Sequence, residues 1–302
     1  MSFLKKLAVD LISVYVKFPV GIRRDYLMNK AYYFLSDVYD YVGIRITNKR
    51  TRNEFVFTLR FPLDILYARL LFTRAYELGT TDFIQRFLLP DDVIFDVGAN
   101  IGYVTLLAAT SVEKGKVFSF EPMPGTFERL TQNIGFNPHL NNITILNRAV
   151  SNQNGEIVLN SFENLHHGHS SISKLNRQDH IEHRVASTTI DNCVAENNLQ
   201  KLDFIKIDVE GAEQMAFAGA KYTLARMKPT VLMEMNEETA NANGFKCYEL
   251  LELLSNISEY SFYRFPGASS DIQIMRDIRD YQHGDNVVAV NRRHQQRLET
   301  II

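Results

Sequence analysis

The sequence predicts an α/β fold built on an open, mostly parallel sheet, and three features lead to that prediction. Residues 93–97 (VIFDV) form a short apolar run closed by glycines, which is typical of a buried strand that turns sharply into a helix. Residues 116–120 (KVFSF) form a second run of this kind, which ends at Glu121. Strand-like and helix-like segments then alternate along the chain, as they do in parallel α/β proteins.

The turn after the first of these strands has the composition of a cofactor-binding loop. Gly98 and Gly102 can adopt positive φ or let the backbone touch a ligand, and the following helix offers free backbone N–H groups. A dinucleotide-binding loop expects glycine where Asn100 stands, because a pyrophosphate must sit against the backbone. S-adenosylmethionine has no pyrophosphate, and its methionine end needs backbone donors and an acid such as Asp96. We therefore predict S-adenosylmethionine as the cofactor, with Glu121 accepting hydrogen bonds from its ribose hydroxyls. An ordinary βα turn beside a surface glutamate is the alternative.

The composition argues against several classes of protein. The chain has 302 residues, 45% of them apolar, which is enough for a large buried core. Its formal net charge of −2 does not suit a general nucleic-acid binder. Cys193 and Cys247 are too few for a disulfide framework, and they do not suggest a thiolate metal site. The cytoplasm is the expected compartment.

Residues 1–75 are expected to form a mainly helical N-terminal extension, and residues 76–302 the main domain. The apolar stretch in residues 1–20 is interrupted by Asp10 and is too short to span a bilayer, so neither a transmembrane segment nor a signal peptide is expected. The helical face of this stretch could pack on the domain, pair with a second copy of the chain in a homo-oligomer, or lie against a membrane surface.

Two strands are expected within this extension. GIRIT (43–47) and EFVFTLRF (54–61) flank a turn rich in lysine and arginine. Such a basic hairpin could contact an anionic substrate, for example a phosphorylated glycan, or it could be a solvated turn. A helix is expected at 64–79, followed by a shorter one that starts at Thr80 or Thr81.

The remaining elements follow Glu121. Pro122 and Pro124 open a helix, a strand is expected at 142–147, and RAVS and EIVLN suggest a short ribbon. The later elements are strands at 204–209, 230–236, 260–265 and 286–290 and helices at 211–227 and 248–257.

Residues 161–183 show no periodicity and contain five of the eight histidines. We expect a loop that closes over a substrate, because long irregular loops in compact domains are usually functional. His166, His167 and His169 could instead bind zinc, or one of them could act as a general base.

Acidic residues stand at the ends of four predicted strands, at Asp96, Glu121, Asp208 and Glu234. In open α/β sheets the ligand lies outside the carboxyl ends of the strands, so we expect these four side chains to converge on one cleft. Asp208 and Glu210 could alternatively cap the helix that follows them.

Seven segments in order resemble the FkbM family of S-adenosylmethionine-dependent methyltransferases. They are VIFDVGANIGYVT, SFEPMPGTFERLTQNI, RAVS, the serine pair in GHSSI, TIDN at 189–192, FIKIDVEGAE and NVVAV. The match runs from about Tyr76 to about Asn291. The resemblance implies a seven-stranded, mostly parallel, Rossmann-like sheet with flanking helices, of the class I methyltransferase type.

The resemblance also implies site residues. Those carried over to the cofactor turn are Asp96, Gly98, Asn100 and Gly102, with Glu121 as the ribose acid. We also assign to cofactor binding Glu77, Tyr103, Pro122, Ala149 and Asp208.

The predicted reaction is methyl transfer to a hydroxyl of a sugar, a glycan or another small natural product. The rate would come mainly from holding the methyl donor and the acceptor oxygen in line. The hydroxyl must lose its proton, and Asp208 is the first candidate for the base, because neighbouring acids would raise its pKa. His167 is another candidate base, and Asp208 with Glu210 or Glu234 could hold Mg²⁺ or Ca²⁺.

Two other functions stay open on the residues alone. A nicotinamide-dependent oxidoreductase would use the same strand and acid, although the missing middle glycine argues against it. A scaffold that keeps the fold without activity would use residues 1–75 as its interaction surface.

Overall fold

The computed structural model describes residues 40–60, 64, 67, 70, 75–161, 170–171, 181–265 and 271–302. Three predictions fall wholly or mostly outside the described residues. They are the N-terminal helical extension, the helix at 64–79, and the catalytic residue His167. Within these ranges, every helix is too short or too polar to cross a membrane.

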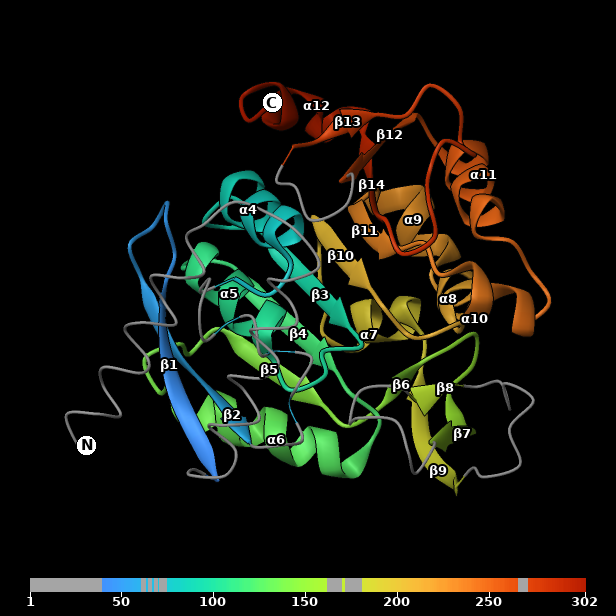
Figure 1. Ribbon diagram of the computed structural model, residues 1–302. Coiled ribbons are helices and arrows are strands. Elements are labelled where there is room, and N and C mark those ends of the chain that lie inside the picture. Colours follow the sequence, from blue (N-terminus) through green and yellow to red (C-terminus); the bar gives the residue numbers. More distant parts are fainter. Residues whose placement is uncertain are drawn as a thin grey trace, which may run out of the picture.

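The centre of the molecule is an eight-stranded sheet in which five neighbouring strands run parallel (Figure 1). Its order is β13 (Gln273–Ile274), β12 (Tyr260–Phe265), β14 (Asn286–Asn291), β11 (Thr230–Glu234), β10 (Phe204–Ile207), β3 (Val93–Val97), β4 (Lys116–Phe120) and β5 (Ile143–Leu146). The predicted parallel α/β arrangement is confirmed, whereas the expected count of seven strands was one too few. The additional strand is β13, two residues of the insertion that pair antiparallel with β12.

Helices cover both faces of this sheet, and for this reason all five residues of β3 are buried. One face packs against α7 (Ile190–Glu196), α8 (Glu213–Ala218), α9 (Lys221–Met227), α10 (Glu237–Ala242) and α11 (Cys247–Ile257). The other packs against α4 (Leu78–Phe87), α5 (Tyr103–Ser111), α6 (Pro124–Gly135) and α12 (Gln295–Glu299).

The single helix expected at 211–227 is divided into α8 and α9 at Gly219. A Cβ atom at Gly219 would lie 2.1 Å from the carbonyl oxygen of Ser151, so the chain there is held against another segment. This tertiary contact is not visible in the helical pattern of the sequence.

The predicted basic hairpin is present as β1 (Tyr41–Thr47) and β2 (Glu54–Arg60). Its buried side chains, including Phe55 and Phe57, belong to the same core as α4 and α5. Arg50 in the turn donates from Nε to the Gln85 carbonyl oxygen over 2.6 Å. This arginine therefore anchors the hairpin to the domain.

A second, four-stranded sheet lies beside the carboxyl ends of the central parallel strands (Figure 1). Its order is β6 (Ala149–Val150), β9 (Ile181–Thr188), β7 (Gly155–Ser161) and β8 (Ser170–Ser171). The expected ribbon of β6 with β7 was wrong, because each of them pairs with β9 and not with the other. β9 begins inside the stretch that showed no periodicity.

The amino end of the central sheet is closed by the chain terminus. Arg297 of α12 donates from Nη1 to both carboxyl oxygens of the buried Asp92, over 2.8 and 3.0 Å. Arg293 in the 3-10 helix η2 (Arg292–His294) lies 2.6 Å from Asp203 Oδ1. These arginines occupy the amino edge beside β3 and β10, and in open α/β sheets a ligand is expected at the opposite, carboxyl edge.

The turn after β10 presents the acidic side chains Asp208 and Glu210. Glu210 has φ 50° and Gly211 has φ 94°, both in the left-handed region. A Cβ atom at Gly211 would lie 2.3 Å from the side-chain nitrogen of Asn243, so glycine is needed there. Glu213 holds the turn, because its Oε1 accepts backbone N–H groups, among them that of Gly211 over 3.2 Å.

We predict that Glu213→Gln makes the stability of the protein less dependent on pH. Burial raises the pKa of the Glu213 carboxyl from 4.5 to about 7. The folded state therefore holds a proton that the unfolded chain releases, and this contribution to stability, complete below about pH 4.5, is lost as the pH rises through 7. Between pH 6 and 8 the wild type should lose roughly 1.4 kcal/mol, or about 3 °C in Tm.

Glutamine keeps the accepting oxygen and carries no charge, so the variant should lack this decline. The measurement is Tm by calorimetry across pH 5–9 for the wild type, Glu213→Gln and Glu238→Gln, in which Glu238 is an exposed glutamate of α10. Parallel profiles for the wild type and Glu213→Gln would contradict the prediction.

Candidate active site

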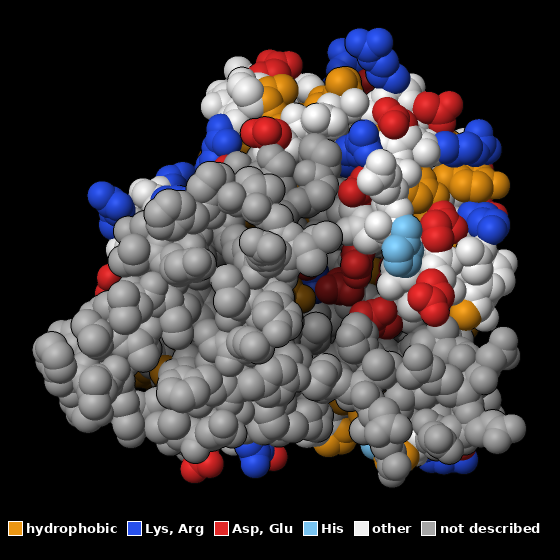
Figure 2. Space-filling model, viewed as in Figure 1, with side chains coloured by type: hydrophobic (Ala, Val, Ile, Leu, Met, Phe, Trp, Pro, Cys, Tyr) orange, Lys and Arg blue, Asp and Glu red, His pale blue; other side chains and the backbone are white. Residues whose placement is uncertain are grey.

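A cavity of about 300 Å³ opens at the carboxyl ends of the parallel strands. Figure 2 shows acidic side chains gathered around a hollow on this face. The residues that line the cavity are Tyr76, Glu77, Val97, Gly98, Asn100, Phe120, Glu121, Pro122, Thr126, Arg148, Ala149, Val150, Ile157, Leu159, Asp208, Val209, Glu210, Ala212, Glu234 and Asn236.

Much of the predicted site is therefore in one place. Of the residues predicted to bind the cofactor, seven line the cavity: Glu77, Gly98, Asn100, Glu121, Pro122, Ala149 and Asp208. The predicted catalytic residues Glu210 and Glu234 line it as well. Asp96, Gly102 and Tyr103 do not.

The loop after β3 contains three residues in the left-handed region, at Gly98 (φ 78°), Asn100 (φ 51°) and Gly102 (φ 95°). A Cβ atom at Gly98 would lie 1.9 Å from the carbonyl oxygen of Asp208, so the ends of β3 and β10 touch through backbone atoms. At Gly102 a Cβ atom would lie 2.6 Å from Leu130 of α6. Gly102 thus allows close packing at the start of α5, while Gly98 and Asn100 face the cavity.

Glu121 is buried at the end of β4, and two backbone groups fix its carboxyl. Oε2 accepts the N–H of Asn100 over 3.0 Å, and Oε1 accepts that of Met123 over 2.9 Å. Burial raises the pKa of this carboxyl to about 7. Both oxygens keep further lone pairs, so the carboxyl can still accept hydrogen bonds from a ligand in the cavity.

Asp96 lies behind the cavity wall, in contrast to the expected convergence of four acids. Its Oδ2 accepts a hydrogen bond from the Thr105 hydroxyl over 2.6 Å, while Oδ1 has no hydrogen-bond partner among the described residues. Burial raises the pKa of Asp96. The carboxyl points from β3 toward α5, and the cavity lies beyond the end of the strand.

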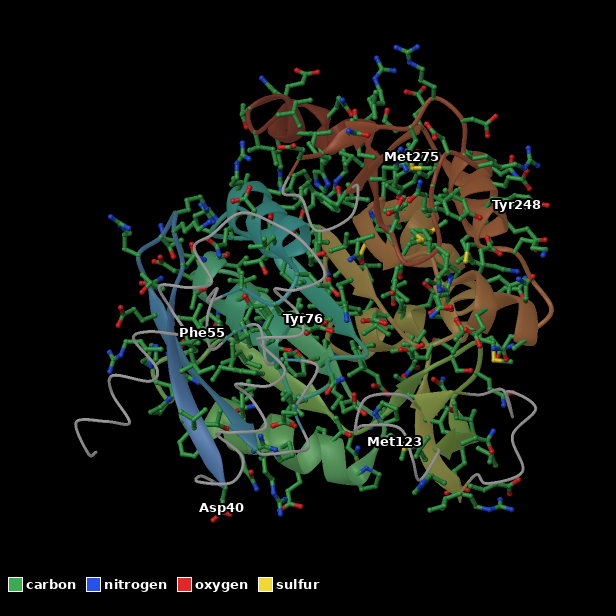
Figure 3. All side chains as sticks on the ribbon, viewed as in Figure 1. Asp40, Phe55, Tyr76, Met123, Tyr248 and Met275 are labelled. Atoms are coloured by element: carbon green, nitrogen blue, oxygen red, sulfur yellow. The ribbon has the colours of Figure 1, made fainter. Side chains whose placement is uncertain are left out.

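Tyr103 packs beneath the site. Its ring makes edge contacts with Phe57 (5.7 Å between centroids) and Tyr76 (6.0 Å), and its hydroxyl lies 3.2 Å from Thr81 Oγ1. In Figure 3, Tyr76 lies between the hairpin that carries Phe55 and the end of β3. Tyr103 therefore supports Tyr76, and Tyr76 reaches the cavity.

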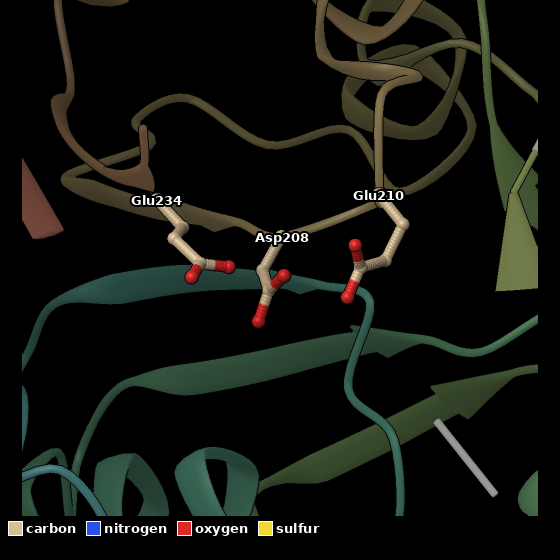
Figure 4. A group of neighbouring side chains, drawn as sticks. All are labelled: Asp208, Glu210 and Glu234. Carbon is tan, nitrogen blue, oxygen red and sulfur yellow. The ribbon is translucent and has the colours of Figure 1, made fainter. Parts of the chain in front are cut away.

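Asp208, Glu210 and Glu234 form an acidic group at the ends of β10 and β11. One carboxylate oxygen from each lies within 4.8 Å of the others. Figure 4 shows the three carboxyl groups side by side, on the same side of the segments that carry them. Burial, followed by the charges of Asp208 and Glu210, raises the pKa of Glu234 to about 8.

Sequence reasoning missed Lys206, the charged residue within the otherwise apolar strand β10. Its Nζ lies 3.0 Å from Asp208 Oδ2 and 3.2 Å from the Gly98 carbonyl oxygen. A lysine inside a buried strand next to acid-bearing strand ends was the available signal, because such a charge needs a partner. Arg148 also lines the cavity and begins the RAVS segment, but it was not assigned to the site. The β7 residues Ile157 and Leu159 were missed because no motif marks them.

Two curated relatives are methyltransferases. The chain is 33% identical over 129 residues to the hexuronic acid methyltransferase AglP of Haloferax volcanii, which is 43% of this chain and 50% of AglP. It is 26% identical over 197 residues to the 2-O-methyltransferase NoeI of Sinorhizobium fredii, which is 61% of this chain and 79% of NoeI. The chain thus spans about half the length of AglP.

Among solved structures, the chain is similar to the methyltransferase FkbM from Methylobacillus flagellatus. The two are 14% identical, with a TM-score of 0.45, over 88% of this chain and 60% of the other.

Residues 96–264, more than half of the chain, match the sequence model of the methyltransferase FkbM domain. This range carries both the glycine-containing loop after β3 and the acid-bearing ends of β4, β10 and β11. The resemblance seen in the sequence motifs is confirmed, and the chain belongs to the FkbM methyltransferase family.

Proposed function

We propose that this protein transfers the methyl group of S-adenosylmethionine to a hydroxyl of a sugar or glycan. The observation that carries the proposal is the cavity that joins the loop at Gly98 and Asn100, the fixed carboxyl of Glu121 and the acidic group around Asp208. The matched family is one of methyltransferases. Two relatives named for hexuronic acid methylation and 2-O-methylation support a sugar-like acceptor.

The residues of the cavity suit the proposed cofactor. Glu121 would accept the ribose hydroxyls, with Pro122 and Ala149 beside the adenine, and Gly98 and Asn100 would bring backbone groups to the ligand. The negative charge of Glu77 and Asp208 suits an ammonium group at the methionine end. When bound, S-adenosylmethionine supplies an electrophilic methyl group on a sulfonium centre, whose positive charge these acids also favour.

The protein would position the acceptor and take up its proton. Carboxyl oxygens of Glu77, Glu210 and Glu234 line the cavity, and sugar hydroxyls are hydrogen-bond donors that complement such acceptors. Asp208 stands at the end of β10, where its backbone carbonyl lies against Gly98 of the cofactor loop, and its carboxyl would receive the hydroxyl proton as the oxygen attacks. Geometry precedes pKa in choosing a general base, and it favours Asp208.

We predict that Asp208→Asn lowers kcat by roughly 10²–10⁴-fold, the usual contribution of a general base. Affinity for S-adenosylhomocysteine should stay within about threefold of the wild type, because Glu77 still faces the ammonium group and asparagine keeps an accepting oxygen. The measurements are calorimetric titration with S-adenosylhomocysteine and methyl transfer to glycan, lipid and small-molecule pools. NAD serves as the control ligand, since binding of NAD in place of S-adenosylhomocysteine would point to an oxidoreductase. Unchanged turnover in Asp208→Asn would remove Asp208 from the mechanism.

A bound cation is the alternative to a base that acts without a metal. The carboxyl oxygens of Asp208, Glu210 and Glu234 would suit Mg²⁺ or Ca²⁺, which prefer oxygen ligands. If Asp208 acts unaided, we predict that dialysis against EDTA leaves kcat unchanged. The opposite result would favour a mechanism with a bound cation. In that case EDTA abolishes activity, and Mg²⁺ or Ca²⁺ restores it in the wild type but not in Glu210→Gln. Glu238→Gln, an exposed change outside the cavity, is the matched control.

A further inference from the structure

We propose that Lys206 is a positioning residue that ties the cofactor-binding loop after β3 to the acidic group at the end of β10. The inference deepens the proposed methyltransferase function and rests on it. Lys206 does not line the cavity, so it acts through Gly98 and Asp208 and not on the acceptor or the reacting atoms.

The contacts of the ammonium group carry the proposal. Nζ donates to the Gly98 carbonyl oxygen over 3.2 Å and to Asp208 Oδ2 over 3.0 Å. The side chain is 12% exposed, so water hardly competes for these bonds. One ammonium thus holds a backbone atom of the cofactor loop and a side chain of the acidic group at the same time.

The surroundings of Lys206 fix it as a cation. In the parallel pairing of β10 with β3, Lys206 lies opposite Asp96, and both side chains project to the same face of the sheet. Burial alone would lower the pKa of the ammonium, but the neighbouring Asp208 and Asp96 raise it above its ordinary value. Lys206 is therefore protonated at working pH, which excludes it as the general base.

The loop is held at both ends of the segment that faces the cavity. Lys206 binds the carbonyl oxygen of Gly98, and Glu121 accepts the N–H of Asn100 over 3.0 Å. Gly98 and Asn100 have positive φ, a backbone conformation that few residues adopt without support. Gly98 N–H and Ala99 N–H donate to the Phe120 carbonyl oxygen and hold the start of the loop. Loss of the Lys206 contact would leave the Gly98 carbonyl group free to turn, and its orientation would then have to be fixed when the cofactor binds.

The test compares Lys206→Met, Lys206→Gln and Lys206→Arg with Lys201→Met. Lys201 stands shortly before the amino end of β10 and pairs with Asp91 (2.8 Å) and Asp203 (3.3 Å), outside the cavity. Lys201→Met therefore removes an ion pair near the same strand without touching the loop.

We measure Kd for S-adenosylhomocysteine by calorimetry, KM for S-adenosylmethionine and for the acceptor, and Tm. Lys206→Met should raise Kd and the KM for S-adenosylmethionine at least tenfold and leave the acceptor KM within about threefold. Lys206→Arg should recover most of the affinity, because it keeps the charge and the donors. Lys201→Met should lower Tm only.

Wild-type affinity for S-adenosylhomocysteine in folded Lys206→Met overturns the proposal, and so does an equal loss of affinity in Lys201→Met. If Lys206→Met does not fold, Lys206→Gln decides by the same criteria. If the wild-type protein binds no S-adenosylhomocysteine, the proposed function itself is contradicted. This result can be told apart from failure of the Lys206 proposal, because it is seen in the wild type before any variant is compared.

Discussion

The backbone contact between Gly98 and Asp208 is the constraint on which the site depends. Neighbouring parallel strands end at the same edge of the sheet, and here the ends of β3 and β10 approach until a Cβ atom on Gly98 would lie 1.9 Å from the Asp208 carbonyl oxygen. Only glycine permits this approach with φ 78°. As a result, the loop at Gly98 lies against the end of β10, and Asp208 lines the same cavity as Gly98 and Asn100.

Gathering several carboxyls in one cavity is unfavourable, and the protein offsets the cost at each in a different way. Glu121 accepts backbone N–H groups, whereas Asp208 has the ammonium of Lys206. At Glu234, burial and the charges of Asp208 and Glu210 outweigh the charge of Lys206 and raise the pKa to about 8. Such strained electrostatics is a common property of functional sites and would be relieved by a positively charged ligand.

Much of this architecture could be predicted from the sequence because it depends on local pattern. The strands around 93–97 and 204–207 are short apolar runs with turn residues at their ends, so their type and order follow from periodicity. β9 could not be predicted, because half of its residues are exposed and the alternation of apolar and polar residues in its sequence is weak. The break at Gly219 comes from a contact with Ser151, which lies far away in the sequence.

The site residues likewise divide into those that a local motif predicts and those that only the folded structure reveals. Gly98, Asn100 and Glu121 follow directly from a strand-turn-helix motif, and they line the cavity as expected. Asp96 belongs to the same motif, yet its position within β3 places it against Thr105, because alternate residues of a strand face opposite sides. Lys206 acts through chain segments that only the pairing of β3 with β10 brings together, so spacing in the sequence does not reveal it.

The cavity is lined by two kinds of chain segment. The ends of β3, β4 and β10 all lie within residues 96–264, the range that the family shares. Tyr76 and Glu77 reach the cavity from outside that range, and Ile157 and Leu159 come from the small sheet at its edge. Side chains on such peripheral segments can change without disturbing these strand ends. If the strand ends hold the methyl donor, as proposed, the acceptor of this chain is to be sought in the contacts of Tyr76, Ile157 and Leu159.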